Sequence, residues 1–173
     1  MSGIDDAVAW LTQARSDART AEAVAQGRSP MRPEDIGCHV ALLCAQSFEK
    51  SIKGSMLLVG QTLTLTHEVE TRIDSMLRQA DIRKGPWRLL RPLFDAPGVR
   101  RLVLTLLAWT PGAASAADPN YEYPWRKLPT AVVAVPCGHP LFEDVTEHAR
   151  WIEAARALSD GLAKIGEAIQ RGR

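Results

Sequence analysis

The chain has 173 residues and a formal net charge of +1; 46% of its residues are hydrophobic and 24% are charged. These values are typical of one folded domain with a buried core, so we predict a single domain over residues 1–173. A chain so close to neutral has no overall field that attracts nucleic acid or an anionic membrane. Any binding of a polyanion therefore requires a local patch.

The start of the chain and its cysteines favour a cytoplasmic location. The opening "MSGIDDAVAW" carries two aspartates and lacks a basic run followed by an apolar run, so we expect no signal peptide. No apolar stretch approaches the roughly 18 residues of a membrane span, so we expect no membrane partner. Cys38, Cys44 and Cys137 are odd in number and include no C-x-x-C pair, which favours reduced thiols.

Two long helices are predicted in the first third of the chain. Residues 5–26 carry apolar side chains at helical spacing, and Gly27 ends the pattern. Pro33 suits the first turn of a second helix, which runs to about Val59 and stops at Gly60. The apolar positions of the first helix are Val8, Leu11, Ala14, Ala18, Ala21 and Val24.

Shorter helical segments follow in the middle of the chain. Thr66 is a suitable N-cap for a helix over residues 67–80. Residues 85–98 are typical of a broken helical piece between prolines. Residues 99–110 are strongly apolar and favour a short helix, although a strand remains the alternative on propensity.

A long loop and a last helix complete the predicted order. Residues 110–130 combine proline, glycine and aromatic residues and indicate a loop; the following "AVVAV" favours a short strand or an extended segment. A last helix covers about residues 143–170. Its apolar stripe is Val145, Ala149, Ile152, Ala155, Leu158, Leu162, Ile165 and Ile169. The chain therefore predicts an all-α fold, an up-and-down bundle of about five helices with a long loop before the last one.

The second helix carries polar side chains in its middle. On a helical wheel its apolar positions fall on one side: Ala41, Ala45, Phe48, Ile52, Met56 and Val59. Four polar residues fall within roughly 60° of one another on the opposite side, with Leu43 and Leu57 interleaved. These four residues, here called the polar strip, are His39, Gln46, Lys50 and Lys53.

The polar strip has two interpretations. Glu49 and Lys53 form an i,i+4 pair in the favourable order, and Lys50 can extend its ammonium out of a half-buried helix, so the strip can be purely structural. Alternatively, Lys50 and Lys53 form a small cationic patch for a phosphate or an acidic partner, with aromatic help from the long loop.

The segment "AQSFEKSIKGSMLLVGQTLTLTH" resembles the signature of HEPN domains. In that signature a helix carries a Glu-Lys pair and a further Lys three residues on, and a Gly turn precedes a His that opens the next helix. Here these residues are Glu49, Lys50, Lys53, Gly60 and His67. The family's Arg-Tyr-Pro in the loop before the last helix is similar to "YEYP" at residues 121–124, but Glu122 stands where the family has Arg.

The resemblance implies an all-α up-and-down bundle that often dimerises, and it implies two functions. Some members are metal-independent ribonucleases, often toxins. Others pair with a minimal nucleotidyltransferase and are thought to bind nucleotides, or to neutralise that partner or be neutralised by it.

The ribonuclease members use an Arg and a His with four to six residues between them, and Arg32 and His39, with six between them, are the pair that fits this spacing here. A His moves protons near neutral pH, and a fixed Arg stabilises a crowded phosphate. In the family, however, the motif usually lies in the later half of the domain. Here it precedes the second helix, and Pro33 follows the Arg directly.

The remaining candidate ligand-binding residues beside Lys50 and Lys53 are His67, Tyr121, Tyr123 and Arg126. Arg126 and Lys127 can replace the cation that Glu122 removes from the loop. The structural alternatives are a neutral His at a helix N-terminus and a loop anchored by its aromatic side chains. Two Cys-His groups, at residues 38–39 and 137–139, fit no common zinc pattern, so we expect neither a metal nor a cofactor.

We therefore expect a HEPN-like module that binds a nucleotide or a partner protein and is associated with a minimal nucleotidyltransferase in a toxin–antitoxin-type pair. The sequence favours such a module over a stand-alone catalyst without deciding whether the protein is an enzyme; if it is one, we expect a ribonuclease. The alternatives are a metal-independent ribonuclease toxin acting on RNA and a structural helical dimer without its own ligand. The leucines beside the polar strip and the apolar stripe of the last helix favour a homodimer of two-fold symmetry.

Overall fold

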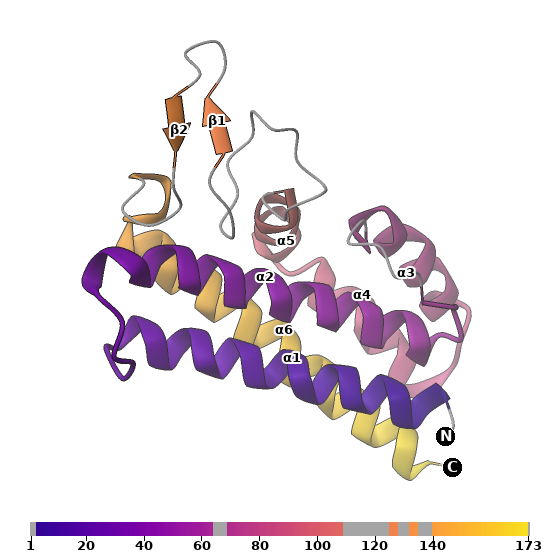
Figure 1. The fold of residues 1–173 in the computed structure, drawn as a ribbon. Helices are drawn as coiled ribbons and strands as arrows, with labels where there is room; N and C mark the ends of the chain where they lie inside the picture. The colour runs from indigo at the N-terminus through magenta and orange to yellow at the C-terminus, as the bar shows by residue number, and fades with distance from the viewer. Residues whose placement is uncertain (1–2, 64–68, 109–124, 128–131, 135–139, 173) are drawn as a thin grey trace.

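The structure is a computed structural model that describes residues 3–63, 69–108, 125–127, 132–134 and 140–172. Its three long helices are α1 (Gly3–Ala25), α2 (Pro33–Leu58) and α6 (Val145–Arg171). The first two form an antiparallel hairpin, and α6 packs across both (Figure 1). α6 runs antiparallel to α1, since Arg156 contacts Glu22 near one end of the bundle and Gln170 Nε2 donates to Asp5 Oδ1 near the other.

α1 and α2 end in the same way, and in both cases a glycine makes the ending possible. Gly27 and Gly60 have φ angles of 69° and 78°, which other residues rarely adopt. The backbone N–H groups of Gly27 and Arg28 donate to the carbonyl oxygens of Val24 and Ala23. Those of Gly60 and Gln61 donate to the carbonyl oxygens of Leu57 and Met56 in the same way. These are the two hydrogen bonds of a Schellman motif, so both predicted helix ends are confirmed.

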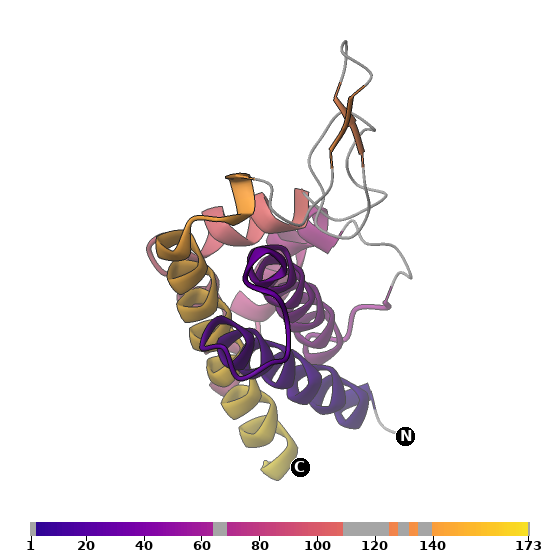
Figure 2. The same ribbon diagram turned by 60° about the vertical axis from the view of Figure 1, so that its left-hand side comes forward.

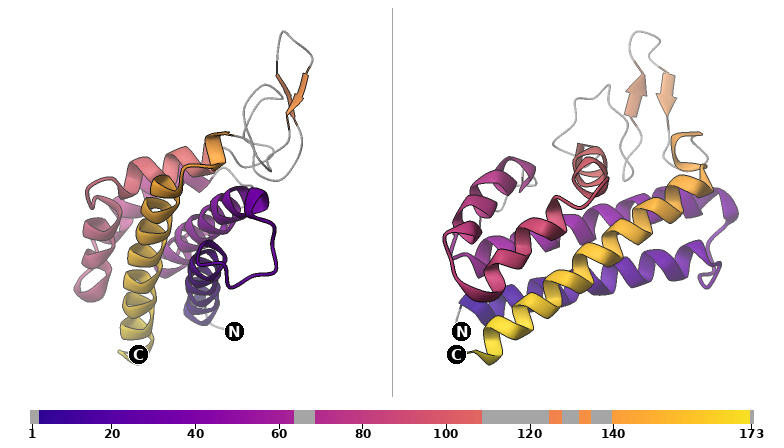
Figure 3. Two further views of the ribbon diagram at one scale, coloured as in Figure 1. Left: turned by 90° about the vertical axis from the view of Figure 1, so that its left-hand side faces the viewer. Right: turned by 180° about the vertical axis from the view of Figure 1, so that it is seen from behind.

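A layer of short helices covers α2 and α6 on the side away from α1 (Figure 3). Its elements are η1 (Val69–Arg72), α3 (Ile73–Asp81), η2 (Gly85–Leu89), α4 (Leu90–Phe94) and α5 (Val99–Ala108). The strands β1 (Trp125–Lys127) and β2 (Val132–Ala134) then pair antiparallel and project away from the helices (Figure 2). The 3-10 helix η3 (Pro140–Phe142) leads into α6.

The described chain is an all-α helical bundle, as predicted. It has six α-helices where about five were expected, because the broken piece at residues 85–98 contains α4 as a separate short helix. Residues 99–108 form α5, so the strand alternative for this segment is wrong. β2 lies within "AVVAV", whereas β1 lies inside the segment expected to be loop. The predicted cap Thr66 lies outside the described residues.

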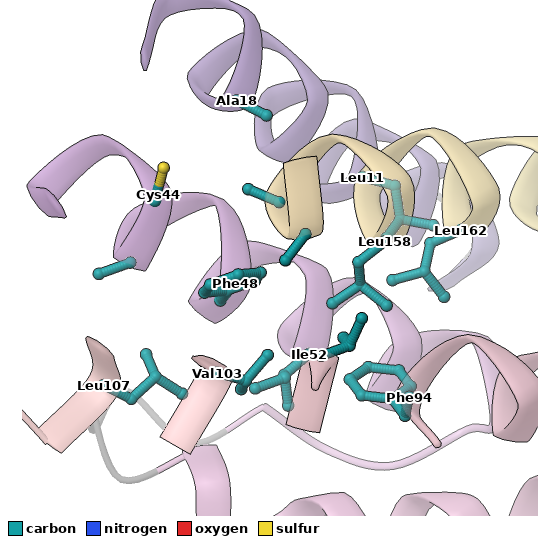
Figure 4. Close-up of a cluster of buried hydrophobic side chains, with 14 of the residues drawn as sticks. Leu11, Ala18, Cys44, Phe48, Ile52, Phe94, Val103, Leu107, Leu158 and Leu162 are labelled. Carbon is teal, nitrogen blue, oxygen red and sulfur yellow. The ribbon is translucent and has the colours of Figure 1, made fainter. Parts of the chain in front are cut away.

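The core lies where α2 meets the other helices (Figure 4). Leu11 of α1, Phe48 of α2, Phe94 of α4 and Leu158 of α6 are each at most 1% exposed. Burial of such a side chain contributes roughly 1.5–3 kcal/mol to stability. The apolar positions predicted for α1 are also buried, except for the half-buried Val8. The helical spacing of apolar residues therefore identified the face of α1 that packs inward.

Small residues let the three long helices approach closely. A Cβ atom at Gly54 of α2 would lie 2.7 Å from Leu11 Cδ2, and one at Gly166 of α6 would lie 3.1 Å from Leu11 Cδ1. Leu11 therefore fits between two glycines from two other helices. Three serines of α2 are also fully buried, with hydroxyls that have no hydrogen-bond partner among the described residues: Ser47, Ser51 and Ser55.

Asp144 caps the N-terminus of α6. Its Oδ1 accepts hydrogen bonds from the backbone N–H groups of Thr146 (2.8 Å) and Glu147 (3.4 Å). These bonds stabilise the ionised carboxylate and lower the pKa of Asp144 below its ordinary value. Because this pKa is depressed in the folded state, the carboxylate adds stability that is present at neutral pH and lost as the pH falls below about 4.

We predict that the Asp144→Asn variant is nearly as stable as the parent near neutral pH. Its stability should fall less than that of the parent when the pH is lowered. Asparagine caps helices about as well as aspartate and does not titrate. Urea unfolding midpoints at about pH 7 and about pH 3 measure both effects. Asp144→Ala is the control and should be less stable at about pH 7. The same pH dependence in the parent and in Asp144→Asn would contradict the role of this carboxylate.

Candidate functional site

The structure places Lys50 of the polar strip against a carboxylate of α1. Lys50 Nζ lies 2.5 Å from Asp17 Oδ2, and Gln13 Nε2 donates to the other oxygen of the same carboxylate. The Asp17 side chain is only 9% exposed, so its charge is largely withdrawn from water. A buried carboxylate without a partner is strongly destabilising, and Lys50 supplies that partner across the helix interface.

Lys53 is engaged in a similar way. Its Nζ lies 2.5 Å from Glu49 Oε1 and 5.3 Å from the centroid of the Trp10 ring, which attracts a cation over its face. The side chains of Lys53 and Glu49 are only 9% and 13% exposed. Both lysines thus have internal partners. This geometry supports the structural interpretation of the polar strip, and a ligand-binding role for the lysines stays a prediction.

We predict that Lys50→Met lowers the free energy of unfolding by about 1–3 kcal/mol, because Asp17 then stays buried with only the hydrogen bond from Gln13. The double variant Asp17→Asn/Lys50→Met should recover part of this loss, since no unpaired charge remains. Urea unfolding of the parent, both single variants and the double variant gives the coupling energy. If the effects of the two single substitutions on the free energy of unfolding simply add in the double variant, the two side chains do not stabilise each other. Lys50 would then be available for a ligand.

Arg32 and His39, the candidate ribonuclease pair, have separate surroundings. Arg32 is the extended residue that precedes α2; its side chain is 76% exposed, and its Nε lies 3.3 Å from Asp35 Oδ2. His39 is half-buried and lines a small pocket near the α1–α2 turn with Met31 and Leu43. Arg32 is not part of the lining of that pocket. The geometry therefore gives no support to a catalytic pair that converges on one phosphate.

Other predicted site residues fall outside the described part of the chain. These are His67, Tyr121 and Tyr123, together with the side chain of Arg126, whose backbone belongs to β1. Their predicted roles stay predictions. Over the described ranges, no group of three or more His, Cys, Asp and Glu side chains is placed to hold a metal ion.

A groove with a volume of about 1000 Å³ runs along the first half of α6. Its other walls are the end of α1 and the start of α2, at the end of the bundle opposite the chain termini (Figure 1). We call it the α6 groove. Its apolar lining comes from the three long helices and from η3: Ala25, Pro33, Ile36, Phe142, Val145, Ala149, Ile152 and Ala157.

One end of the α6 groove depends on a close backbone approach. Gly37 packs so tightly against η3 that a Cβ atom would lie 1.6 Å from the carbonyl oxygen of Phe142. The same oxygen lies 2.6 Å from Nε2 of the buried His148. The His148 ring in turn packs against Trp151, with centroids 5.4 Å apart. Gly37 and His148 therefore fix η3 between α2 and α6.

The rim of the α6 groove is acidic. Glu22, Glu143, Glu153 and Asp160 contribute four carboxylates, against one guanidinium from Arg156. Arg156 Nη1 lies 2.9 and 2.7 Å from the two carboxylate oxygens of Glu22, so the charge of Arg156 is already compensated. Glu143 and Glu153 are exposed. The groove therefore combines an apolar surface with a net negative charge.

The α6 groove is not predicted by the sequence alone, although the apolar stripe of the last helix contains a signal for it. That stripe predicts one continuous buried face. In the structure, Ile152 and all later members of the stripe are buried, whereas Val145 is 74% exposed and Ala149 is exposed as well. The stripe thus continues past the core into the groove, where no described residue covers Val145 and Ala149.

The α6 groove has the features of a binding surface. Its described lining contains His148 but no Ser, Thr, Cys or Lys that could act as a nucleophile beside it. Cys38 and Cys44 are buried elsewhere in α2, and burial raises the pKa of the Cys44 thiol to about 12, which keeps it protonated and unreactive.

Comparisons with known proteins return no match to a family model, to a curated protein or to a solved structure. The HEPN resemblance consequently rests on the residues quoted for it above. Within the described ranges, no helix combines the length and the apolar character needed to cross a membrane.

We predict that Gly37→Ala lowers the free energy of unfolding by about 1–3 kcal/mol or more, because the added methyl group overlaps the Phe142 carbonyl and displaces η3. Gly3→Ala is the matched control: its Cβ meets nothing within 4 Å, so the variant should be neutral or slightly more stable. Thermal unfolding measures both variants. If Gly37→Ala were as stable as the parent, the close contact between α2 and η3 would be refuted.

Proposed function

We propose that this chain is a HEPN-like module of the cytoplasm that binds a partner protein, a minimal nucleotidyltransferase, and does not act as an enzyme on its own. The α6 groove carries the binding part of the proposal, because an exposed apolar surface bounded by polar residues is typical of a protein interaction site. The nucleotidyltransferase is the partner that the HEPN resemblance implies.

The charges favour a protein over a nucleotide as the ligand. A phosphate in the α6 groove would approach four carboxylates, and like charges repel one another. A phosphate at the polar strip would compete with Asp17 for Lys50 and with Glu49 for Lys53. Both surfaces therefore disfavour a phosphorylated ligand.

The ribonuclease toxin ranks second for a related reason. Arg32 is paired with Asp35, and His39 lies in a pocket that Arg32 does not line. Catalysis by such a pair requires both side chains at one phosphate. Activity would thus depend on a rearrangement at the start of α2.

The predicted homodimer also stays a prediction. The apolar stripe of α6 was one reason to expect it, but the stripe from Ile152 onward is buried within the chain itself. Leu43 and Leu57, the other reason, are half-buried. The exposed part of the stripe belongs to the α6 groove, which we assign to the partner protein.

The test uses the product of a neighbouring nucleotidyltransferase gene and measures its binding to the purified chain by isothermal titration calorimetry. We expect a stable complex. Ala149→Trp should abolish binding, because an indole fills the groove at an exposed position. Lys164→Trp is the matched control, since it adds an indole at an exposed position on the same helix outside the groove.

Two results would overturn the proposal. Equal affinity of the parent and Ala149→Trp would place the partner on another surface. Cleavage of RNA in the presence of chelator by the parent, but not by His39→Ala, would make the ribonuclease the leading function. Circular dichroism of each variant establishes that the fold is retained.

A further inference from the structure

We infer that the α6 groove recognises a basic, amphipathic helical segment of the partner, an inference that rests on the proposed partner-binding function. Three properties of the groove carry it: its length, the spacing of its uncovered apolar residues, and the sign of its rim charge.

The length of the groove fits a peptide segment. Its lining on α6 extends from Val145 to Asp160, a rise of roughly 22 Å at 1.5 Å per residue. A helix of about 15 residues has the same length. The opposite wall comes from the end of α1 and the start of α2, through Ala25 and Ile36. A helix in this position would cover the exposed Val145 and Ala149 at the start of α6.

The uncovered apolar residues have the spacing of a helix-packing face. The exposed Val145 and Ala149 lie four residues apart, and the later members of the stripe, from Ile152 on, continue at intervals of three or four residues. Those later members are buried in the bundle. The first part of the stripe thus resembles the buried later part, but no described element packs on it. An amphipathic helix with apolar residues at matching intervals fits this surface.

The negative charge of the rim favours an occupant with positive charge. Glu143 and Glu153 are exposed and have no ion-pair partner among the described residues. Glu153 and Asp160 lie seven residues apart on α6, which is roughly 10.5 Å or two helical turns. Asp160 already lies 3.9 Å from Arg19 and 4.0 Å from Arg156, so the exposed Glu143 and Glu153 are the carboxylates that Lys or Arg side chains of the occupant would meet. Rim charges of this kind act mainly on the association rate and on the choice of partner.

Other occupants match only part of the groove. An acidic helix would cover Val145 and Ala149 but would be repelled by the rim. A small polyamine would satisfy the carboxylates but leave the apolar surface in water. A basic amphipathic helix complements both the surface and the charge.

The probe is a synthetic peptide of about 15 residues, with Leu at helical intervals and Lys on the remaining face. Three comparison probes are the same peptide with Glu for Lys, a scrambled Leu/Lys peptide without helical spacing, and spermidine. Fluorescence anisotropy of the labelled peptide, with spermidine added as a competitor, measures binding. We expect only the ordered Leu/Lys peptide to bind, with a Kd on the order of micromolar at low salt and a weaker Kd at high salt.

The double variant Glu143→Lys/Glu153→Lys should weaken this binding by about tenfold or more, because it reverses the two uncompensated rim charges. Glu167→Lys is the control for the single variant Glu153→Lys: it reverses one charge on the same helix about four turns beyond Glu153, at a carboxylate 3.8 Å from Arg15, and it should change the Kd less than about twofold. Ala149→Trp should abolish binding by filling the groove.

Equal binding of the scrambled or the acidic peptide would overturn the inference, as would an unchanged Kd in the double charge reversal. Displacement of the peptide by micromolar spermidine would assign the groove to a small cation instead.

The inference and the proposed function fail in different ways. If Ala149→Trp abolishes binding of the nucleotidyltransferase and the charge reversal does not affect it, the proposed function stands and the basic helix is refuted. If the peptide binds as expected and the nucleotidyltransferase does not, the assigned partner is refuted and the specificity of the groove stands.

Discussion

The packing of Leu11 between Gly54 and Gly166 determines how α1, α2 and α6 are arranged. A Cβ atom at Gly54 would lie 2.7 Å from Leu11 Cδ2 and 3.2 Å from the carbonyl oxygen of Ala7, and one at Gly166 would lie 3.1 Å from Leu11 Cδ1, so a side chain at either position would displace Leu11. α6 crosses the α1–α2 hairpin obliquely, so it separates from α1 toward its own start (Figure 3). There the long side chains of Glu22 and Arg156 join the two helices. The α6 groove is the space that this divergence leaves.

The same close packing explains the lysines in the middle of α2. A helix that is surrounded on most sides has little access to water, so any charge at its interface requires a partner of opposite sign. Asp17 and Lys50 satisfy this condition between α1 and α2, and Glu49 and Lys53 satisfy it within α2. Lys50 and Lys53 therefore contribute to the packing of the hairpin.

Much of the helical architecture was predictable because it depends on local sequence. Gly27 and Gly60 end their helices through backbone conformations that neighbouring residues cannot supply, and apolar spacing identifies the buried side of each long helix. The i,i+4 pair of Glu49 and Lys53 was visible for the same reason. The partner of Lys50 was not, because Asp17 lies 33 residues away on another helix.

The candidate site was less predictable because it depends on the angles between helices. Gly37 is an ordinary helical glycine in the sequence, and its importance appears only when Phe142 is placed against it. The acidic groove is likewise hidden by the net charge of +1. Residues 72–101 carry eight basic and three acidic side chains, so this segment offsets the carboxylates that gather around the start of α6. Net charge averages over surfaces that point in different directions.

The hydrogen bond between Gln170 and Asp5 holds the two ends of the described chain side by side (Figure 1). This pole of the bundle is the one farthest from the α6 groove. A protein fused to either end, or a solid support to which either end is attached, would therefore sit behind the molecule and leave the groove facing outward. Neighbouring ends of this kind also suit circular permutation, in which a linker joins them and the chain is opened at another surface turn.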